Sequence, residues 1–292
     1  MVLFSRIRAF MAEPLPSMKG KVVLITGATR GIGRAGAEAM AERGAGLILV
    51  GRNEGRLQGV RTSCEAKGAS TVRTIQADLS FRQQVADLAH QISADGSGVD
   101  VLWNNAGGYF ADRKISPEGY ERTWAMNHLA YFDFTQLLFP LLLKAKDPRV
   151  LCTASEAHRW GKMEWDNLQG EKKWDGWKAY CNSKLANLLY VAEQGRRLGR
   201  SPIRVCAVHP GLVNSAFGDE NTGLKAKAFL WLKRRFGRTN EQGADTAVWL
   251  AARSERPNQG AYYSNRNEKV PSAAARNQED ARRLWQISEA GP

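Results

Sequence analysis

Short runs of apolar residues recur along this chain, and longer stretches with a helical spacing of apolar positions separate them. The strand-like runs occupy 22–26, 47–50, 72–76, 101–103, 150–153 and 203–208, with a weaker one at 261–263. The helix-compatible stretches are 35–42, 83–92, 120–143 and 180–198. Strands that alternate with helices predict a parallel sheet covered on both faces. We therefore expect an α/β fold with a doubly wound, mostly parallel, seven-stranded Rossmann sheet that binds ligands beyond the carboxyl ends of its strands.

The domain organisation follows from the even composition. The 292 residues show no composition break, repeat or low-complexity tract, which predicts one domain over 19–292 after an N-terminal extension at 1–18. The four cysteines have no metal-type spacing, so we predict a reduced, cytoplasmic protein without a metal site. The apolar run 137–143 contains Pro140 and is far shorter than the roughly 20 residues that a bilayer requires.

The formal net charge of +13 requires an explanation. Its densest cluster, 225–238, has six basic residues, no acid and an apolar aromatic centre. We favour a substrate lid over 216–240 whose apolar face points inward. A peripheral membrane contact through 225–238 is the alternative. Nucleic-acid binding ranks lower, because no recognised binding motif accompanies the charge.

A glycine-rich turn follows the first strand-like run and opens the first helix. It reads Thr26-Gly27-Ala28-Thr29-Arg30-Gly31-Ile32-Gly33. Gly27 permits a tight turn, while Gly31 and Gly33 let the backbone and the helix N-terminus approach a pyrophosphate. The strand before and the helix after make this a strong signal for a dinucleotide site, with Thr29, Arg30 and Ile32 among its contacts.

Tyr180 and Lys184 are four residues apart on a predicted helix and therefore share one face. A phenol has an ordinary pKa of about 10, so it is a poor acid–base catalyst near neutrality. A fixed cation nearby favours the phenolate, and we expect Lys184 to lower the pKa of Tyr180. Downstream of a dinucleotide turn, this pair predicts a general acid/base beside a nicotinamide.

The identity of the cofactor follows from charge. An adenosine ribose with free hydroxyls is usually held by an acid at the end of the second strand, but this strand ends in Val50-Gly51-Arg52-Asn53. Arg52 and Arg30 present guanidinium groups that suit bidentate contacts with a phosphate. We therefore predict NADP(H) in preference to NAD(H).

With these motifs the chain resembles the single-domain branch of the short-chain dehydrogenase/reductase family, over about 19–252. Three further segments support the likeness: Asn104-Asn105-Ala106-Gly107, Leu151-Cys152-Thr153-Ala154-Ser155 and Pro210-Gly211-Leu212-Val213-Asn214-Ser215. Ser155-Glu156-Ala157-His158 with an insertion at 156–178 is similar to the retinol-dehydrogenase-like subgroup. The segment 236–251 is similar to dehydrogenase/reductase member 12.

The resemblance implies roles for particular residues. Ser155, Tyr180 and Lys184 would be catalytic, and Asn127 would hold a water of the proton relay near the lysine. The remaining cofactor contacts implied are Asp78 and Leu79 at the adenine, Asn105, Ala106 and Gly107 along the adenosine side, and Pro210, Gly211, Val213 and Ser215 beside the nicotinamide. Reduction of a carbonyl would then take hydride from NADPH and a proton from Tyr180.

The aromatic residues of the chain indicate the class of substrate. Several of them could approach the pocket: Tyr109, Phe110, Trp160, Trp165, Trp174, Trp177, Phe229 and Trp231. They favour an apolar small-molecule carbonyl or alcohol such as a retinoid, a sterol or a lipid-derived aldehyde or ketone. An oligomer is possible, through the helices that carry Asn127 and Tyr180.

Three rival functions were weighed. A non-catalytic NADP-binding sensor is disfavoured because Asn127, Ser155, Tyr180 and Lys184 are all present. An epimerase or dehydratase that acts on nucleotide sugars usually has a Gly-x-x-Gly-x-x-Gly turn and a larger C-terminal substrate portion, and neither is visible here. A hydrolase that used His158 as base would require a nucleophile elbow, which does not surround Ser155.

Overall fold

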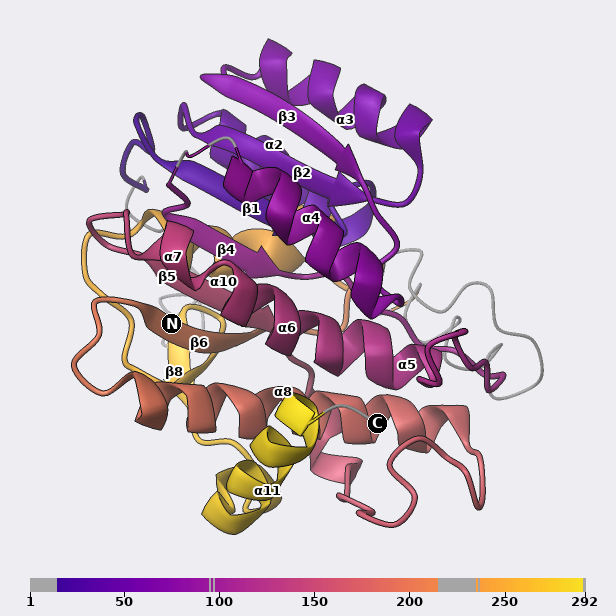
Figure 1. The fold of residues 1–292 in the computed structure, drawn as a ribbon. Helices are drawn as coiled ribbons and strands as arrows, with labels where there is room; N and C mark the ends of the chain where they lie inside the picture. Colours follow the sequence, from indigo (N-terminus) through magenta and orange to yellow (C-terminus); the bar gives the residue numbers. More distant parts are fainter. Residues whose placement is uncertain (1–14, 95, 97, 215–234, 236, 291–292) are drawn as a thin grey trace.

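A computed structural model describes residues 15–94, 96, 98–214, 235 and 237–290. In the described chain, parallel strands alternate with helices in the predicted way (Figure 1). The strands are β1 (Val22–Thr26), β2 (Gly46–Gly51), β3 (Thr71–Gln76), β4 (Val101–Asn104), β5 (Arg149–Thr153), β6 (Arg204–His209), β7 (Tyr262–Ser264) and β8 (Asn267–Lys269). The longer helices are α2 (Gly31–Ala41), α3 (Glu54–Ala66), α4 (Arg82–Ala94), α6 (Ala130–Leu137), α8 (Gly176–Leu198), α10 (Asn240–Ala252) and α11 (Gln278–Ala290).

The strands form one sheet in the order β3-β2-β1-β4-β5-β6-β7-β8. Every pair is parallel except β7 with β8. The chain moves outward from β1 in one direction to β3 and then crosses back to β4. The boundary between β1 and β4 is therefore the switch point, and crevices for ligands lie beyond the carboxyl ends of the strands there. The fold class is confirmed.

Two hydrophobic cores cover the two faces of the sheet. One core takes Leu24 from β1 and packs it with apolar residues of α4, α6, α8 and α11. The other takes Val23 and Ile25 from the same strand and packs them with residues of α2, α3 and α10. Since successive side chains of a strand point to opposite faces, the continuous apolar run of β1 supplies both cores.

The strand count differs from the predicted seven, because the described chain has an eighth strand. Asn265 and Arg266 both adopt positive φ, at 54° and 56°, as the two central residues of a tight hairpin turn do. This turn folds β8 back antiparallel to β7. The strand is exposed and reads Asn-Glu-Lys, so it carries no apolar pattern that the sequence could reveal.

The predicted helix over 120–143 is not continuous. It is divided into α5 (Arg122–Trp124), the π-helical turn η1 (Ala125–Leu129), α6 and α7 (Phe139–Leu142). Pro140 lies at the start of α7, where its missing N–H is tolerated. The π-helical turn contains Asn127. Such turns are rare in proteins overall, and those that occur are often found at functional sites.

The predicted insertion 156–178 forms the 3-10 turn η2 (Glu156–Trp160), an irregular segment and the first residues of α8. Asp175 caps α8 by accepting a hydrogen bond from the Lys178 backbone N–H at 3.0 Å. The helix therefore begins four residues before Tyr180. Near the C-terminus, a second 3-10 turn, η3 (Ala274–Arg276), precedes α11. In the described part, none of the helices has the length and apolarity that crossing a bilayer demands.

Candidate active site

A cavity of about 980 Å³ lies beyond the carboxyl ends of the strands at the switch point. Its walls come from the turns after β1, β2, β3, β4, β5 and β6 and from the N-terminal half of α8. All five motif segments predicted from the sequence contribute residues to it. The predicted site residues that line it are Gly27, Thr29, Arg30, Gly31, Ile32, Arg52, Leu79, Asn105, Ala106, Gly107, Ser155, Tyr180, Lys184, Pro210, Gly211 and Val213.

The glycine turn is held against the end of β4. Thr26 Oγ1 accepts hydrogen bonds from the backbone N–H groups of Asn105 and Ala106 at 2.8 and 3.0 Å, and Asn105 Nδ2 donates to Thr26 O at 2.9 Å. A Cβ added to Gly33 would lie 2.4 Å from Gly27 O, so the helix starts where a side chain has no room. Gly27 and Gly31 have positive φ, at 67° and 58°.

The N-terminus of α2 is suited to a pyrophosphate. Arg30 is its N-cap residue in an extended conformation, and its side chain caps no backbone N–H. The first turn of α2 also contains no acidic side chain. The helix therefore presents N–H groups and the positive end of its dipole to the cavity, which fits the phosphates of a dinucleotide.

Three arginines line the cavity near the end of β2: Arg30, Arg52 and Arg56. Arg52 Nη1 lies 3.8 Å from Asp78 Oδ2, while Asp78 Oδ1 accepts from the N–H and hydroxyl of Ser80. Asp78 does not line the cavity, although its neighbour Leu79 does. Among the described residues, Glu156 is the acid in the lining, next to Ser155. This end of the cavity is therefore positive and fits a phosphate on the adenosine ribose.

Asn127 is buried beneath the cavity and does not line it. Its Nδ2 donates to Gly108 O and Ser183 Oγ, both at 2.9 Å, and its Oδ1 accepts from Gly108 N at 2.9 Å. Asn127 thus fixes the loop after β4 to the helix that carries Tyr180 and Lys184. A Cβ added to Gly107 would lie 3.1 Å from Asn127 Oδ1 and 3.5 Å from Lys184 Nζ, so a side chain there would press on Asn127.

Lys184 is 3% exposed, and its Nζ donates to Thr153 O at 3.1 Å. Its Nζ also lies 5.8 Å from the centre of the Tyr180 ring. Burial lowers the pKa of Lys184 to about 8, because the charged ammonium loses its hydration. This amine can therefore exchange a proton near neutral pH.

Burial raises the pKa of Tyr180 to about 12, and a hydrogen bond with the Ser155 side chain only partly opposes this. The net direction is opposite to the lowering that we expected from Lys184. The physical reason is that desolvation of a fully buried phenolate outweighs the attraction of the Lys184 ammonium, which donates to the Thr153 carbonyl. With the protein's own groups, Tyr180 is held as a protonated acid.

The structure separates the aromatic residues that sequence analysis had grouped. Tyr109, Phe110, Trp160 and Trp177 line the large cavity. The ring centres of Tyr109 and Trp177 are 6.0 Å apart, and each lies about as close to the Tyr180 ring, at 6.1 and 5.7 Å. Trp174 instead donates its Nε1–H to Ala111 O at 2.7 Å.

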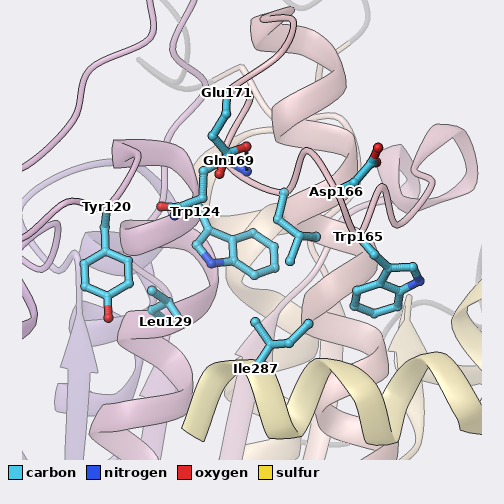
Figure 2. A pocket seen from close by; sticks show the side chains of 9 residues that line it. Tyr120, Trp124, Leu129, Trp165, Asp166, Gln169, Glu171 and Ile287 are labelled. Carbon is cyan, nitrogen blue, oxygen red and sulfur yellow. Dashed lines mark hydrogen bonds between the residues drawn. The ribbon is translucent and has the colours of Figure 1, made fainter. Parts of the chain in front are cut away.

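Trp165, Asp166 and Glu171 line a second cavity, of about 220 Å³, apart from the site. Figure 2 shows this cavity with the indole of Trp124 between Tyr120 and Trp165 and with Ile287 contributed by α11. Trp165 also has the Arg283 guanidinium 4.6 Å from its ring centre. These insertion residues therefore pack the 156–178 segment onto the C-terminal helix rather than the site.

The short chain dehydrogenase family model matches residues 21–223. The chain belongs to the short-chain dehydrogenase family. It is 34% identical over 273 residues to human retinol dehydrogenase 11, which covers 93% of this chain and 85% of that protein. This places it in the retinol-dehydrogenase-like subgroup, and it is accordingly an oxidoreductase of alcohol and carbonyl groups.

Two solved structures are similar to this chain in fold and sequence. A structure of an uncharacterised Mycobacterium paratuberculosis protein has a TM-score of 0.76 and 30% identity, with 94% of each chain covered. A short chain dehydrogenase from Burkholderia cenocepacia in complex with NADP has a TM-score of 0.68 and 25% identity, with 85% of this chain and 96% of that chain covered.

Some predicted parts of this dehydrogenase lie outside the described residues. They are Ser215, the extension 1–14 and most of both the lid 216–240 and the basic segment 225–238. Sequence analysis also missed two features. The first is Arg56, which lines the cavity from the first turn of α3. Asn53 caps this helix by accepting a hydrogen bond from Arg56 N at 2.8 Å. An asparagine so soon after β2 is a helix-start signal that could have located Arg56. Leu212 borders the site with 36% exposure, and its place between the predicted contacts Gly211 and Val213 was the available signal.

Proposed function

We propose that this protein is an NADP(H)-dependent oxidoreductase that interconverts a carbonyl and an alcohol on an apolar substrate, with Tyr180 as the general acid/base. The proposal rests on the convergence of the candidate catalytic residues and the candidate cofactor-binding residues in one cavity. Ser155, Tyr180 and Lys184 line the same cavity as the glycine turn and the three arginines. Proton transfer and dinucleotide binding therefore share one space.

The chemistry requires one hydride and one proton for each carbonyl reduced. NADPH, when bound, supplies the hydride. Tyr180 gives its proton to the carbonyl oxygen, and its raised pKa keeps it protonated near neutrality. Ser155 donates a hydrogen bond to the same oxygen as negative charge develops there. Lys184, whose pKa is lowered to about 8, can return a proton toward the phenolate.

NADP(H) rather than NAD(H) is supported by the cluster of Arg30, Arg52 and Arg56 at the end of β2. A guanidinium forms charge-assisted, often bidentate, hydrogen bonds with a phosphate. Asp78 lies outside the lining, and its Oδ2, 3.8 Å from Arg52 Nη1, offsets part of this charge, so the three arginines keep a net positive charge. The NADP complex of the Burkholderia cenocepacia relative is consistent with this assignment.

An apolar substrate is supported by the mouth of the cavity. Trp160, Trp177 and Leu212 are among the exposed large apolar residues of the described chain, at 68%, 41% and 36% exposure, and all three line this cavity. Concentrated apolar surface around a site that also contains polar reacting groups is typical of a small-molecule pocket. A retinoid, a sterol or a lipid-derived aldehyde or ketone would suit it.

The test follows NADPH absorbance during incubation of the protein with aldehydes, ketones, sterols and retinoids. We expect turnover with at least one apolar carbonyl. Tyr180→Phe should abolish turnover while it leaves NADPH affinity, measured by fluorescence titration, nearly unchanged. Retained turnover in Tyr180→Phe would refute the role of the phenol. Silence with every carbonyl, despite tight NADPH binding, would favour a non-catalytic sensor.

A further inference from the structure

His158 is fully buried, three residues after Ser155, and does not line the cavity. Its ring nitrogen Nδ1 lies 2.7 Å from Ser155 O, and its own backbone N–H donates to the same oxygen at 3.1 Å. Its other ring nitrogen, Nε2, lies 3.2 Å from Ser272 N. The imidazole therefore connects the backbone of Ser155 to a segment more than one hundred residues later in the chain.

These two partners determine the tautomer of His158. Ser272 N is a backbone donor, so Nε2 must accept and cannot carry a proton. Ser155 O can only accept, so the ring proton lies on Nδ1. The ring is thus neutral, and burial, which lowers the pKa of His158, favours the same form. Both nitrogens are satisfied only in this arrangement.

The turn that His158 fixes also determines where the Ser155 hydroxyl points. Ser155 Oγ accepts a hydrogen bond from Ala157 N at 3.2 Å. Because the Ala157 N–H holds Ser155 Oγ from within the turn, the position of the turn sets where this hydroxyl meets Tyr180, with which it forms a hydrogen bond. Movement of the turn would therefore move a donor that the reaction uses.

The C-terminal part of the chain holds the other side of the ring. Tyr262 of β7 packs edge-on against His158, with ring centres 5.5 Å apart, and its hydroxyl donates to Glu156 Oε1 at 2.7 Å. Ser272 Oγ accepts from Ala275 N at 3.3 Å, which attaches the anchor to η3. The segment from β7 to η3 thus forms the outer support of the Ser155 turn.

We propose that His158 is a positioning residue that orients the Ser155 hydroxyl through the Nδ1 contact and couples it to the C-terminal segment through the Nε2 contact. This inference rests on the proposed function, because it assigns Ser155 a role in the reaction. His158 itself touches neither substrate nor cofactor.

Two amide variants separate the two contacts. The side-chain nitrogen of Asn lies as far from Cβ as Nδ1 does, so His158→Asn can still donate to Ser155 O but cannot reach Ser272. The amide of Gln reaches the position of Nε2, so His158→Gln can still accept from Ser272 N but leaves Ser155 O without the ring donor. Ser272→Ala removes the hydroxyl, keeps the backbone N–H and is the matched control.

We expect His158→Gln to lower kcat about tenfold or more, with the KM for NADPH unchanged, because displaced reacting groups lose rate rather than cofactor affinity. His158→Asn keeps a donor to Ser155 O and loses only the coupling to Ser272, so it should lower kcat clearly less than His158→Gln, and Ser272→Ala should keep kcat within about threefold of the wild type. The decisive comparison adds Ser155→Ala. If His158 acts through the Ser155 hydroxyl, His158→Gln should cost almost nothing further once that hydroxyl is gone.

Equal kcat losses in His158→Asn and His158→Gln, or losses that multiply in the Ser155→Ala double variant, would overturn the inference. A measurement on the unaltered protein tests it even if the variants fail to fold. The chain has four histidines, and ¹⁵N NMR of histidine-labelled protein should show His158 as a neutral Nδ1–H tautomer at pH 7. An Nε2–H or charged ring would refute the proposal. Absent turnover in the wild type would refute the proposed function instead and leave the tautomer result intact.

Discussion

Replacement of Lys184 by methionine should make the protein inactive and more stable. The side chain is 3% exposed on α8, and among the described residues no carboxylate forms an ion pair with it. Its Nζ donates a hydrogen bond to Thr153 O at 3.1 Å. Methionine has nearly the same length and shape and carries no charge, so Lys184→Met removes the cost of burying an ammonium group.

The expected gain in the free energy of unfolding follows from the lowered pKa of Lys184. Burial lowers the pKa of Lys184 from 10.5 to about 8, and at 1.36 kcal/mol per unit this corresponds to about 3 kcal/mol of lost stability when the amine is charged. The hydrogen bond to Thr153 O is worth about 1 kcal/mol and is lost in the variant. The net gain at pH 7 is therefore about 2 kcal/mol, or a rise in Tm of about 4 °C for a domain of this size.

The sign of the pH dependence is fixed by the lowered pKa. Below pH 8 the folded protein contains the buried charge, and the penalty is fully present. Between about pH 8 and pH 10.5 the folded protein releases the proton that the unfolded chain still binds, so wild-type stability rises with pH. The advantage of Lys184→Met should therefore shrink over this window and turn into a deficit of about 1 kcal/mol near its upper end, where only the lost hydrogen bond remains.

The assay is urea or thermal unfolding without added cofactor, at pH 7 and at pH 10, because a ligand would add its own stabilisation. Lys178→Met is the matched control, since Lys178 is on the same helix but half exposed, in an ion pair with Glu164 at 2.6 Å. Such a surface pair contributes about 0–1 kcal/mol. A Lys184→Met variant less stable than wild type at pH 7, or an advantage that is the same at both pH values, would refute the reasoning.

Three other variants test the cofactor, the substrate and the turn. Arg52→Asp should lower NADPH affinity about tenfold or more and shift preference toward NADH, because a charge-assisted phosphate contact is lost; an unchanged affinity ratio would count against the assignment. Trp177→Leu should raise the KM for bulky apolar carbonyls and spare small aldehydes, as compared in parallel initial-rate assays. Gly33→Ala should lower stability by about 1–3 kcal/mol and weaken NADPH binding, since its Cβ would meet Gly27 O at 2.4 Å. The control is Gly59→Ala in α3, where the added Cβ meets open space, and it should be neutral or stabilising in the same thermal unfolding measurements.

The fold class and most of the residues around the cavity could be predicted from the amino-acid sequence alone. The strand runs are local patterns, and their regular alternation with helices leaves few sheet topologies. The glycine turn, Ser155, Tyr180 and Lys184 were found for the same reason, since each occupies a fixed place beside a strand end or along a helix. Once the topology was known, these places had to meet at the switch point.

Properties that depend on the surroundings of a residue could be read only from the three-dimensional fold. The pKa of Tyr180 rises although Lys184 is nearby, because burial is a property of everything packed around the phenol. The separation of Trp177 in the site from Trp165 in the second cavity depends on where the insertion meets α11. The contact of His158 with Ser272 joins residues far apart in the chain, and no periodicity or spacing records such a contact. Local sequence fixes which groups are available, whereas desolvation and long-range packing fix how they behave.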